Sequence, residues 1–130
     1  MNIITYGTFD ILHKGHINLL LKAKQYSGDY LIVAVSTDEF NQLKGKMAYE
    51  SFEIRKAKLE ALPFVDKVIA EKSWEQKFKD IEEYDVDIFV IGDDWKGKFD
   101  YLERFCDVVY LPRTPGISSS DLRKKMEAGL

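Results

Sequence analysis

Apolar residues occur along this chain in two alternating kinds of run. The first kind is short and continuous, rich in β-branched or aromatic residues, and bounded by Gly, Asp or Pro; these runs are 3–6, 30–36, 67–70, 87–92 and 107–111. The second kind is longer and repeats its apolar positions with helical spacing, in 16–26, 51–62 and 73–84. Continuous apolarity is typical of strands covered on both faces, whereas the longer runs predict helices with one buried face.

The alternation of strands and helices predicts an α/β fold. Parallel strands need crossover connections, and the three helical runs can supply them, so we expect a five-stranded parallel sheet flanked by helices. The chain has 130 residues, without an internal repeat, a low-complexity tract or a linker. We therefore expect 1–130 to form a single domain.

The composition is that of a folded globular protein, with 45% hydrophobic, 13% aromatic and 32% charged residues. A net charge of −3 gives no basic field that would gather nucleic acid, so we expect no nucleic-acid partner. No apolar run approaches the roughly 18 residues of a membrane span, and "MNIITYGTFD" lacks the features of a signal peptide. The single cysteine, Cys106, fits a reducing compartment or a buried filler role. We expect a cytoplasmic protein without membrane insertion.

Ligands of open parallel sheets bind beyond the carboxyl ends of the strands, where the strand order reverses. Four such ends carry unusual residues: "GTFDILHKGH" (7–16), "STDEFNQLKGK" (36–46), "GDDW" (92–95) and "PRTPGISSSDLR" (112–123). These segments are predicted as loops that meet at one edge of the sheet.

Both histidines of the chain lie in the first of these segments. Gly7 allows a close backbone approach, Gly15 permits a turn, and the next helix is predicted to begin at or near His16. A helix N-terminus attracts anions, and His13 and His16, three residues apart, would share one face if the turn is helical. Capping or surface histidines are the alternative. A zinc site would need further ligands such as Cys106, and neither G-x-G-x-x-G nor a Walker A loop is present.

The last segment resembles the first in its chemistry. Ser118 and Asp121 have the spacing of a capping box that starts a helix. Arg113, between two prolines, can bind two phosphate oxygens at once, so a second phosphate cradle is predicted here. Helix capping alone also explains the serines.

Further cations accompany these segments. Lys44 and Lys46 flank Gly45, where mobile cations could close over a charged substrate, although solvated surface lysines look the same in sequence. Arg55 and Lys77 lie on predicted helices, where solvent exposure or ion pairing is the alternative.

The segment "GDDW" offers carboxylates and the ring of Trp95 to a sugar or base, although Asp93 and Asp94 could equally form a turn. Taken together, the loops predict a site in which cationic donors hold a polyphosphate. No Ser or Cys has a base beside it, which argues against a covalent mechanism.

These residues resemble a known family. "GTFDILHKGH" matches the H-x-G-H motif of the nucleotidyltransferase superfamily, and "RTPGISSSDLR" matches the R-T-x-G-I-S-T-T segment of its cytidylyltransferase branch. The resemblance extends to "YLIVAVSTDEFN", "WEQK" and "GDDWKGKFDYL". It implies a Rossmann-like three-layer sandwich, one cytidylyltransferase domain over 1–130, and a homodimer. It also implies transfer of CMP from CTP to sn-glycerol 3-phosphate with Mg²⁺, giving pyrophosphate and CDP-glycerol, a precursor of teichoic acid or related polymers.

The resemblance also implies roles for individual residues. The groups around the triphosphate would be Thr8, Phe9, His13, Gly15 and His16, and the second nucleotide segment would be Arg113, Thr114, Gly116, Ile117, Ser118, Ser119 and Ser120. Asp94 and Trp95 would lie near the cytidine, Lys44 and Lys77 would hold the glycerol phosphate, and Lys46 and Arg55 would support the charged centre. No residue is assigned to a metal; Asp10 is either a metal contact or a loop brace.

The chain departs from the family pattern at two places. Pro63 stands where relatives commonly carry Arg, near nucleotide and dimer contacts, and Ser119 and Ser120 replace two threonines. Pro63 favours one alternative, a protein that binds nucleotide without catalysis. Independently of these departures, the acceptor could be ribitol 5-phosphate or phosphoethanolamine, or the donor ATP.

The expected chemistry is direct in-line attack. A phosphate monoester with a second pKa near 6 is already anionic at neutral pH and needs no general base. Positioning and electrostatic stabilisation then dominate, and His13, His16, Lys44, Lys46 and Arg113 are the expected catalytic residues.

Overall fold

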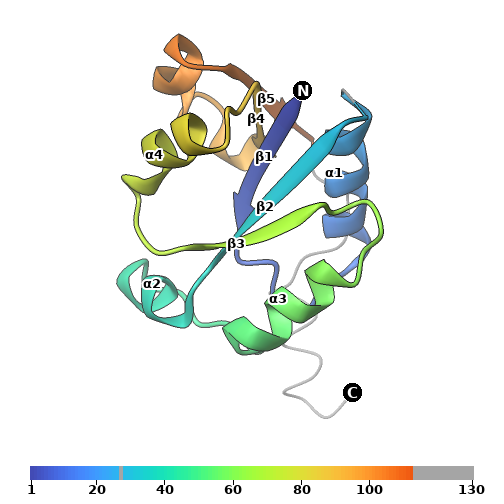
Figure 1. Cartoon of the computed structure of the whole chain (residues 1–130). Coiled ribbons are helices and arrows are strands. Elements are labelled where there is room, and N and C mark those ends of the chain that lie inside the picture. The colour runs from blue at the N-terminus through green and yellow to red at the C-terminus, as the bar shows by residue number, and fades with distance from the viewer. Residues whose placement is uncertain (27, 113–130) are drawn as a thin grey trace.

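The computed structural model describes residues 1–26 and 28–112. These residues form one parallel sheet of five strands. The strands are β1 (Asn2–Gly7), β2 (Tyr30–Ser36), β3 (Lys67–Glu71), β4 (Ile88–Gly92) and β5 (Asp107–Leu111). Their spatial order is β3-β2-β1-β4-β5 (Figure 1). The five predicted strands are confirmed; 30–36 and 107–111 have the predicted bounds, and β3 extends one residue further, to Glu71.

Within residues 1–26 and 28–112, four α-helices and two 3-10 helices connect the strands. They are α1 (Lys14–Gln25), α2 (Asp38–Leu43), α3 (Phe52–Glu60), α4 (Gln76–Glu83), η1 (Asp93–Trp95) and η2 (Asp100–Arg104). The three predicted helices are present, but α1 begins at Lys14 rather than at His16, and α2 stands where a loop was predicted. Thr37 is the N-cap of α2, because its hydroxyl oxygen accepts the N–H of Phe40 at 3.1 Å. The helix has only six residues, which are too few to show a helical repeat of apolar positions in the sequence.

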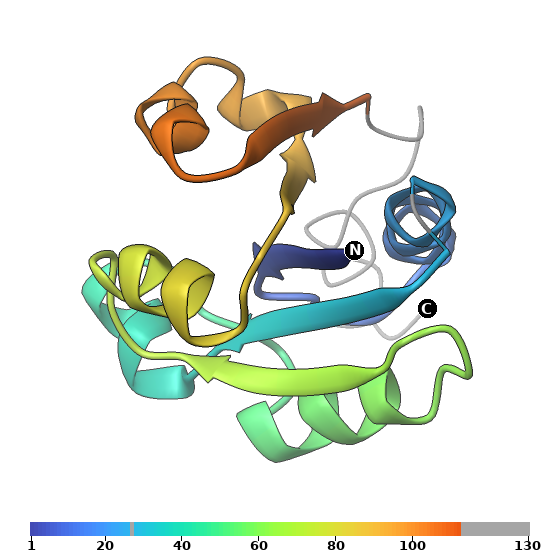
Figure 2. The same ribbon diagram turned by 45° about the horizontal axis from the view of Figure 1, so that its top comes forward.

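The sheet has a hydrophobic core on each face, because alternate residues of a strand point to opposite sides. Ile3 and Val33 pack with Leu20 of α1 and Leu59 of α3. The opposite core contains Ile4, Ile32 and Phe89 from the strands, Ile81 from α4 and Leu102 from η2. Figure 2 shows α1 and α4 on opposite sides of the stacked strands. The predicted three-layer sandwich is confirmed.

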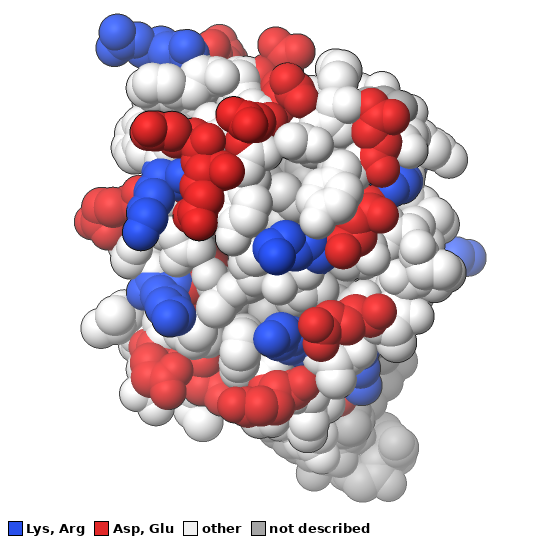
Figure 3. Space-filling view, in the orientation of Figure 1, with Lys and Arg blue, Asp and Glu red and all other residues white. Residues whose placement is uncertain are grey.

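The strand order reverses beside β1, which pairs with β2 on one side and with β4 on the other. The loops after these strands therefore meet at the carboxyl edge of the sheet, where ligands of such sheets bind. Acidic and basic side chains are interspersed over the face drawn in Figure 3. Among the residues described, no helix is both long and apolar enough to cross a membrane.

Candidate active site

A cavity of about 440 Å³ opens at the carboxyl edge of the sheet. Its lining comes from the loops after β1, β2 and β4 and from β3 and α4. The lining residues are Tyr6, Gly7, Thr8, Phe9, Asp10, His16, Lys44, Gly45, Lys46, Met47, Glu71, Trp74, Lys77, Ile91, Trp95 and Phe99. The structure thus brings together Thr8, Phe9, His16, Lys44, Lys46, Lys77 and Trp95 of the predicted site.

The two histidines form a stacked pair at the N-terminus of α1. His13 is the N-cap, and its Nδ1 accepts the N–H of Gly15 at 3.0 Å; Nδ1 of His16 accepts the N–H of His13 at 3.3 Å. The ring centroids are 3.8 Å apart. The predicted shared face and the capping alternative are therefore both realised. Because both Nδ1 atoms accept, the neutral rings carry their protons on Nε2.

His16 is a neutral donor rather than a cation in this structure. Burial, followed by the charge of His13, lowers the pKa of His16 to about 3. At neutral pH the ring of His16 therefore carries a single N–H, so in its predicted role it would donate to phosphate as a neutral group. The Phe9 ring packs edge-on against His16, with the two ring centroids 5.4 Å apart, and contributes to this apolar surrounding.

The loop between β1 and α1 has an unusual backbone. Phe9 and Ile11 have φ values of 52° and 49°, which residues other than glycine rarely adopt. A Cβ on Gly7 would lie only 3.0 Å from the Phe9 ring, so the close approach that Gly7 allows is made by that ring. Strain of this kind is stored where the surrounding structure over-determines it, and it is common at functional sites.

Asp10 braces this loop against the segment before α3. Its carboxylate accepts the N–H groups of Tyr49 at 2.7 Å and Glu50 at 3.0 Å, and the side chain of Glu50 accepts the N–H of Ile11 at 3.1 Å. Asp10 is 4% exposed. The loop-bracing alternative for Asp10 is therefore confirmed.

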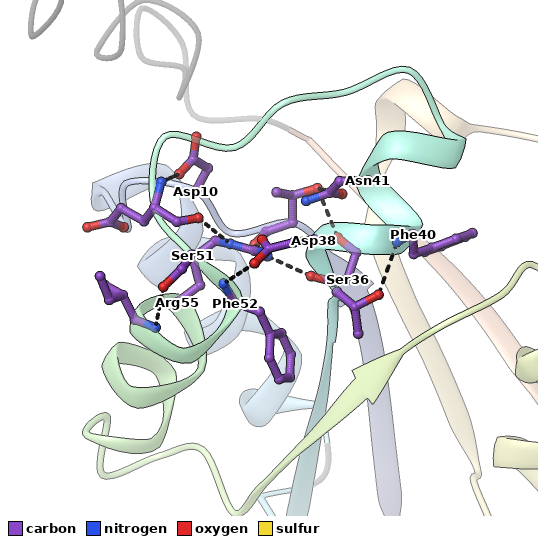
Figure 4. A network of polar contacts seen from close by, with 12 residues as sticks. Asp10, Ser36, Asp38, Phe40, Asn41, Ser51, Phe52 and Arg55 are labelled. Atoms are coloured by element: carbon purple, nitrogen blue, oxygen red, sulfur yellow. Dashed lines mark hydrogen bonds and ion pairs between the residues drawn. The ribbon is translucent and has the colours of Figure 1, made fainter.

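Arg55 lies completely buried beneath the same loops (Figure 4). Its guanidinium donates to the carbonyls of Glu50 at 3.0 Å, Thr8 at 2.9 Å and Ser36 at 2.7 Å, and to the Asp38 carboxylate at 2.8 Å. Arg55 is not among the residues that line the cavity. These bonds brace the loops around the cavity, while support of the charged centre and contact with substrate stay predictions.

Thr8 is held by the neighbouring strand and helix. Its Oγ1 lies 3.1 Å from Oγ of Ser36 and donates to Oδ1 of Asn41 at 3.3 Å. The side chain is therefore fixed at the junction of β1, β2 and α2.

Lys44 and Lys46 reach the cavity from the turn after α2. The ammonium of Lys44 lies 4.7 Å from the centre of the Phe40 ring, and that of Lys46 lies 5.7 Å from the centre of the Trp95 ring. Burial lowers the pKa of Lys44 below its usual value. Lys44 is half-buried, which the solvated-lysine alternative did not assume, whereas Lys46 is exposed and fits that alternative while its ammonium lies near the Trp95 ring.

Lys77 occupies an aromatic box. It is 1% exposed, and its Nζ lies 4.6, 5.4 and 5.2 Å from the ring centres of Tyr6, Trp74 and Phe99. Nζ also donates to Oε2 of Glu71 at 2.8 Å, so the ion-pair alternative for Lys77 is confirmed. A contact with the acceptor phosphate stays a prediction.

The remaining predicted residues are distributed as follows. Trp95 lines the cavity, whereas Asp94 is exposed and lies outside the lining. Gly15 lies within the first turn of α1. Pro63 is exposed and precedes β3, at the opposite edge of the sheet from the cavity. The predicted residues Arg113, Thr114, Gly116, Ile117, Ser118, Ser119 and Ser120 lie outside the described residues.

Several cavity residues were not predicted. Glu71 follows directly on the predicted strand 67–70, so the rule that ligands bind at the carboxyl ends of strands also applied to it. Trp74 begins the quoted segment "WEQK" and Tyr6 ends the predicted strand 3–6, but neither ring was singled out, because aromatic residues also fit ordinary helix and strand positions. Among the described residues, no group of three or more His, Cys, Asp or Glu could hold a metal ion, so the zinc alternative has no support there.

The fold and the site define an α/β protein with a cavity beside a helix N-terminus, an arrangement that suits phosphorylated ligands. Residues 4–125 match the family described as Cytidylyltransferase-like. The chain is 60% identical to "Glycerol-3-phosphate cytidylyltransferase" of Bacillus subtilis (strain 168), covering 98% of each chain. It is 58% identical to the protein of the same name from Bacillus spizizenii (strain ATCC 23059 / NRRL B-14472 / W23), covering 95% of each.

The fold comparison agrees with the sequence comparison. The crystal structure of the lipopolysaccharide core biosynthesis protein from Thermoplasma volcanium GSS1 superposes with a TM-score of 0.75 at 28% identity, covering 88% of this chain and 98% of that one. The chain belongs to the cytidylyltransferase-like family.

Proposed function

We propose that this protein transfers CMP from CTP to sn-glycerol 3-phosphate, releasing pyrophosphate and CDP-glycerol. The observation that carries the proposal is the meeting of His16, at the start of α1, with Lys44 and Lys46 in one cavity. An imidazole N–H, a helix N-terminus and two ammonium groups suit a reaction that brings one phosphate onto another. The names of the two Bacillus relatives support CTP and glycerol 3-phosphate as the substrates.

The reaction proceeds by direct in-line attack of the acceptor phosphate on the α-phosphorus of CTP. The attacking oxygen is already anionic at neutral pH, so no residue has to remove a proton from it. His16 donates its Nε2 proton in a hydrogen bond to the phosphate, where charge increases in the transition state. Lys44 and Lys46 neutralise the two phosphates, and the rigid loop braced by Arg55 keeps the donors aligned.

Mg²⁺ is proposed to enter with the nucleotide. This ion commonly keeps several waters and binds through substrate phosphates rather than through an all-protein cage. The described residues fit that mode, since they contain no cluster of metal ligands and both oxygens of Asp10 accept backbone N–H groups. Bound in this way, the ion would neutralise charge on the phosphates.

We also propose that the protein acts as a homodimer in the cytoplasm, without a nucleic-acid partner. The resemblance supports the dimer, and the charge of −3 argues against nucleic acid. Light scattering after gel filtration should give twice the 15.1 kDa of one chain.

The experiment that tests the reaction is a screen of nucleotides against phosphorylated alcohols, measured by pyrophosphate release. We expect CTP with sn-glycerol 3-phosphate to give the highest kcat/KM, above ribitol 5-phosphate, phosphoethanolamine or ATP as donor. Tight CTP binding without pyrophosphate release for any acceptor would refute the catalytic proposal in favour of a nucleotide-binding regulator.

A further inference from the structure

One wall of the cavity carries a buried carboxylate that the proposed chemistry does not use. Glu71 ends β3 and is 3% exposed. Its Oε2 accepts from Lys77 at 2.8 Å, whereas no donor among the described residues is paired with Oε1. Glu71 lines the cavity, and among the described residues Oε1 is not one of the enclosed side-chain atoms that lack a partner. The second oxygen of Glu71 therefore has unused capacity for a donor that a ligand supplies.

The surrounding charges define which donor fits. Lys77 compensates the charge of Glu71, and the rings of Tyr6, Trp74 and Phe99 hold Lys77 in place. A phosphate oxygen has no proton to donate to a carboxylate. A cationic group would be repelled, because Lys77 and Lys44 already lie within electrostatic range of Glu71. A neutral hydroxyl group satisfies the acceptor without adding charge.

Glu71 lies at a distance from the end of β1 that a hydroxyl group of the acceptor substrate can reach. Glu71 is paired with Ser36 of β2, and Val35 of β2 is paired with Gly7, where the loop to α1 begins. With neighbouring strands about 4.8 Å apart, Glu71 lies roughly 10 Å from the end of β1. A short polyol chain extending from a phosphate near α1, together with one hydrogen bond of about 2.8 Å, covers this distance.

We propose that Glu71 is a specificity-determining residue whose Oε1 accepts a hydrogen bond from a hydroxyl group of the polyol phosphate acceptor. The inference rests on the proposed cytidylyl transfer and adds the group that distinguishes a polyol phosphate from a simple alkyl phosphate. A site that hydrogen-bonds a substrate hydroxyl strongly rejects the analogue without it, because its buried polar group is then left unpaired.

The test compares sn-glycerol 3-phosphate with n-propyl phosphate, which has the same carbon chain and no hydroxyl groups. We expect the wild-type kcat/KM to favour the polyol by a factor of about 100 or more. In Glu71→Gln this preference should fall at least about tenfold, because a charge-assisted hydrogen bond is replaced by a neutral one. If the substitution also displaces Lys77, kcat/KM falls for both acceptors. This effect cancels in the ratio of the two kcat/KM values.

Glu60→Gln is the matched control, since Glu60 is exposed at the end of α3 and outside the cavity lining. It should leave the preference unchanged. If Glu71→Gln fails to fold by circular dichroism, Glu71→Asp takes its place, because it keeps a charge near Lys77 while withdrawing the carboxylate from the cavity. An unchanged preference in the folded variant overturns this inference alone. A wild-type protein that releases no pyrophosphate with any acceptor overturns the proposed function and this inference with it.

Discussion

The protonation state of His16 is set by the residues around it. Its Nδ1 accepts the N–H of His13, which leaves the proton on Nε2, and burial keeps the ring neutral. The two histidines and their spacing were evident in the sequence, and so was the prediction that they share a face. The charge of His16 was not predictable, because it depends on the Phe9 ring and on the depth of the site.

Replacing His16 by Ala removes one donor to the phosphate that gains charge. We expect kcat to fall on the order of 100-fold or more, with a smaller change in KM for CTP. Steady-state pyrophosphate release measures both constants. His16→Gln supplies the comparison, because its amide N–H can donate and should restore part of kcat; wild-type turnover in His16→Ala would contradict the role.

The lowered pKa of His16 also makes folding stability depend on pH. Between about pH 3 and 6.5 the unfolded state binds a proton at this ring that the folded state does not, so stability falls as the pH is lowered through that window. Thermal unfolding from pH 7 to 5 should show the Tm of the wild type falling more than that of His16→Gln. Parallel curves for the two proteins would show that the ring is not buried neutral.

At the scale of elements, hydrogen bonds from side chains connect the strand ends to the helix starts. The sequence predicted which elements carry these side chains but not their burial or their partners. Arg55 was predicted on a helix, and α3 confirms this, but nothing in its local pattern indicated complete burial. Its bonds join the carboxyl ends of β1 and β2 to the start of α2. The short helix α2 was missed for a related reason, since its start depends on the cap made by Thr37.

Arg55→Met should destabilise the protein by roughly 3 kcal/mol or more, because buried carbonyls lose their donors and Asp38 loses its partner. Urea unfolding measures the change. Arg104→Met is the matched control: Arg104 is exposed at the end of η2, and its loss should cost less than about 0.5 kcal/mol. Equal stabilities of the two variants would disprove the bracing role of Arg55.

At the scale of the whole molecule, the order of strand and helical runs was enough to predict a parallel α/β sheet and its ligand edge. Continuous apolar runs and the rule for crossovers carry that information. The cavity wall made by Tyr6, Trp74 and Phe99 was not predictable, because it forms only when α4 and η2 pack against the same face of the sheet.

Both tryptophans of the chain, Trp74 and Trp95, line the cavity, with ring centroids 6.5 Å apart. When the indoles are excited selectively over the seven tyrosines, the emission of the protein therefore originates beside the cavity, without background from remote indoles. A cytosine base stacking on either ring should quench that emission, and a CTP titration followed at the emission maximum should saturate. The molecule thus carries its own optical reporter of occupancy, and affinities of variants can be measured without attaching a dye.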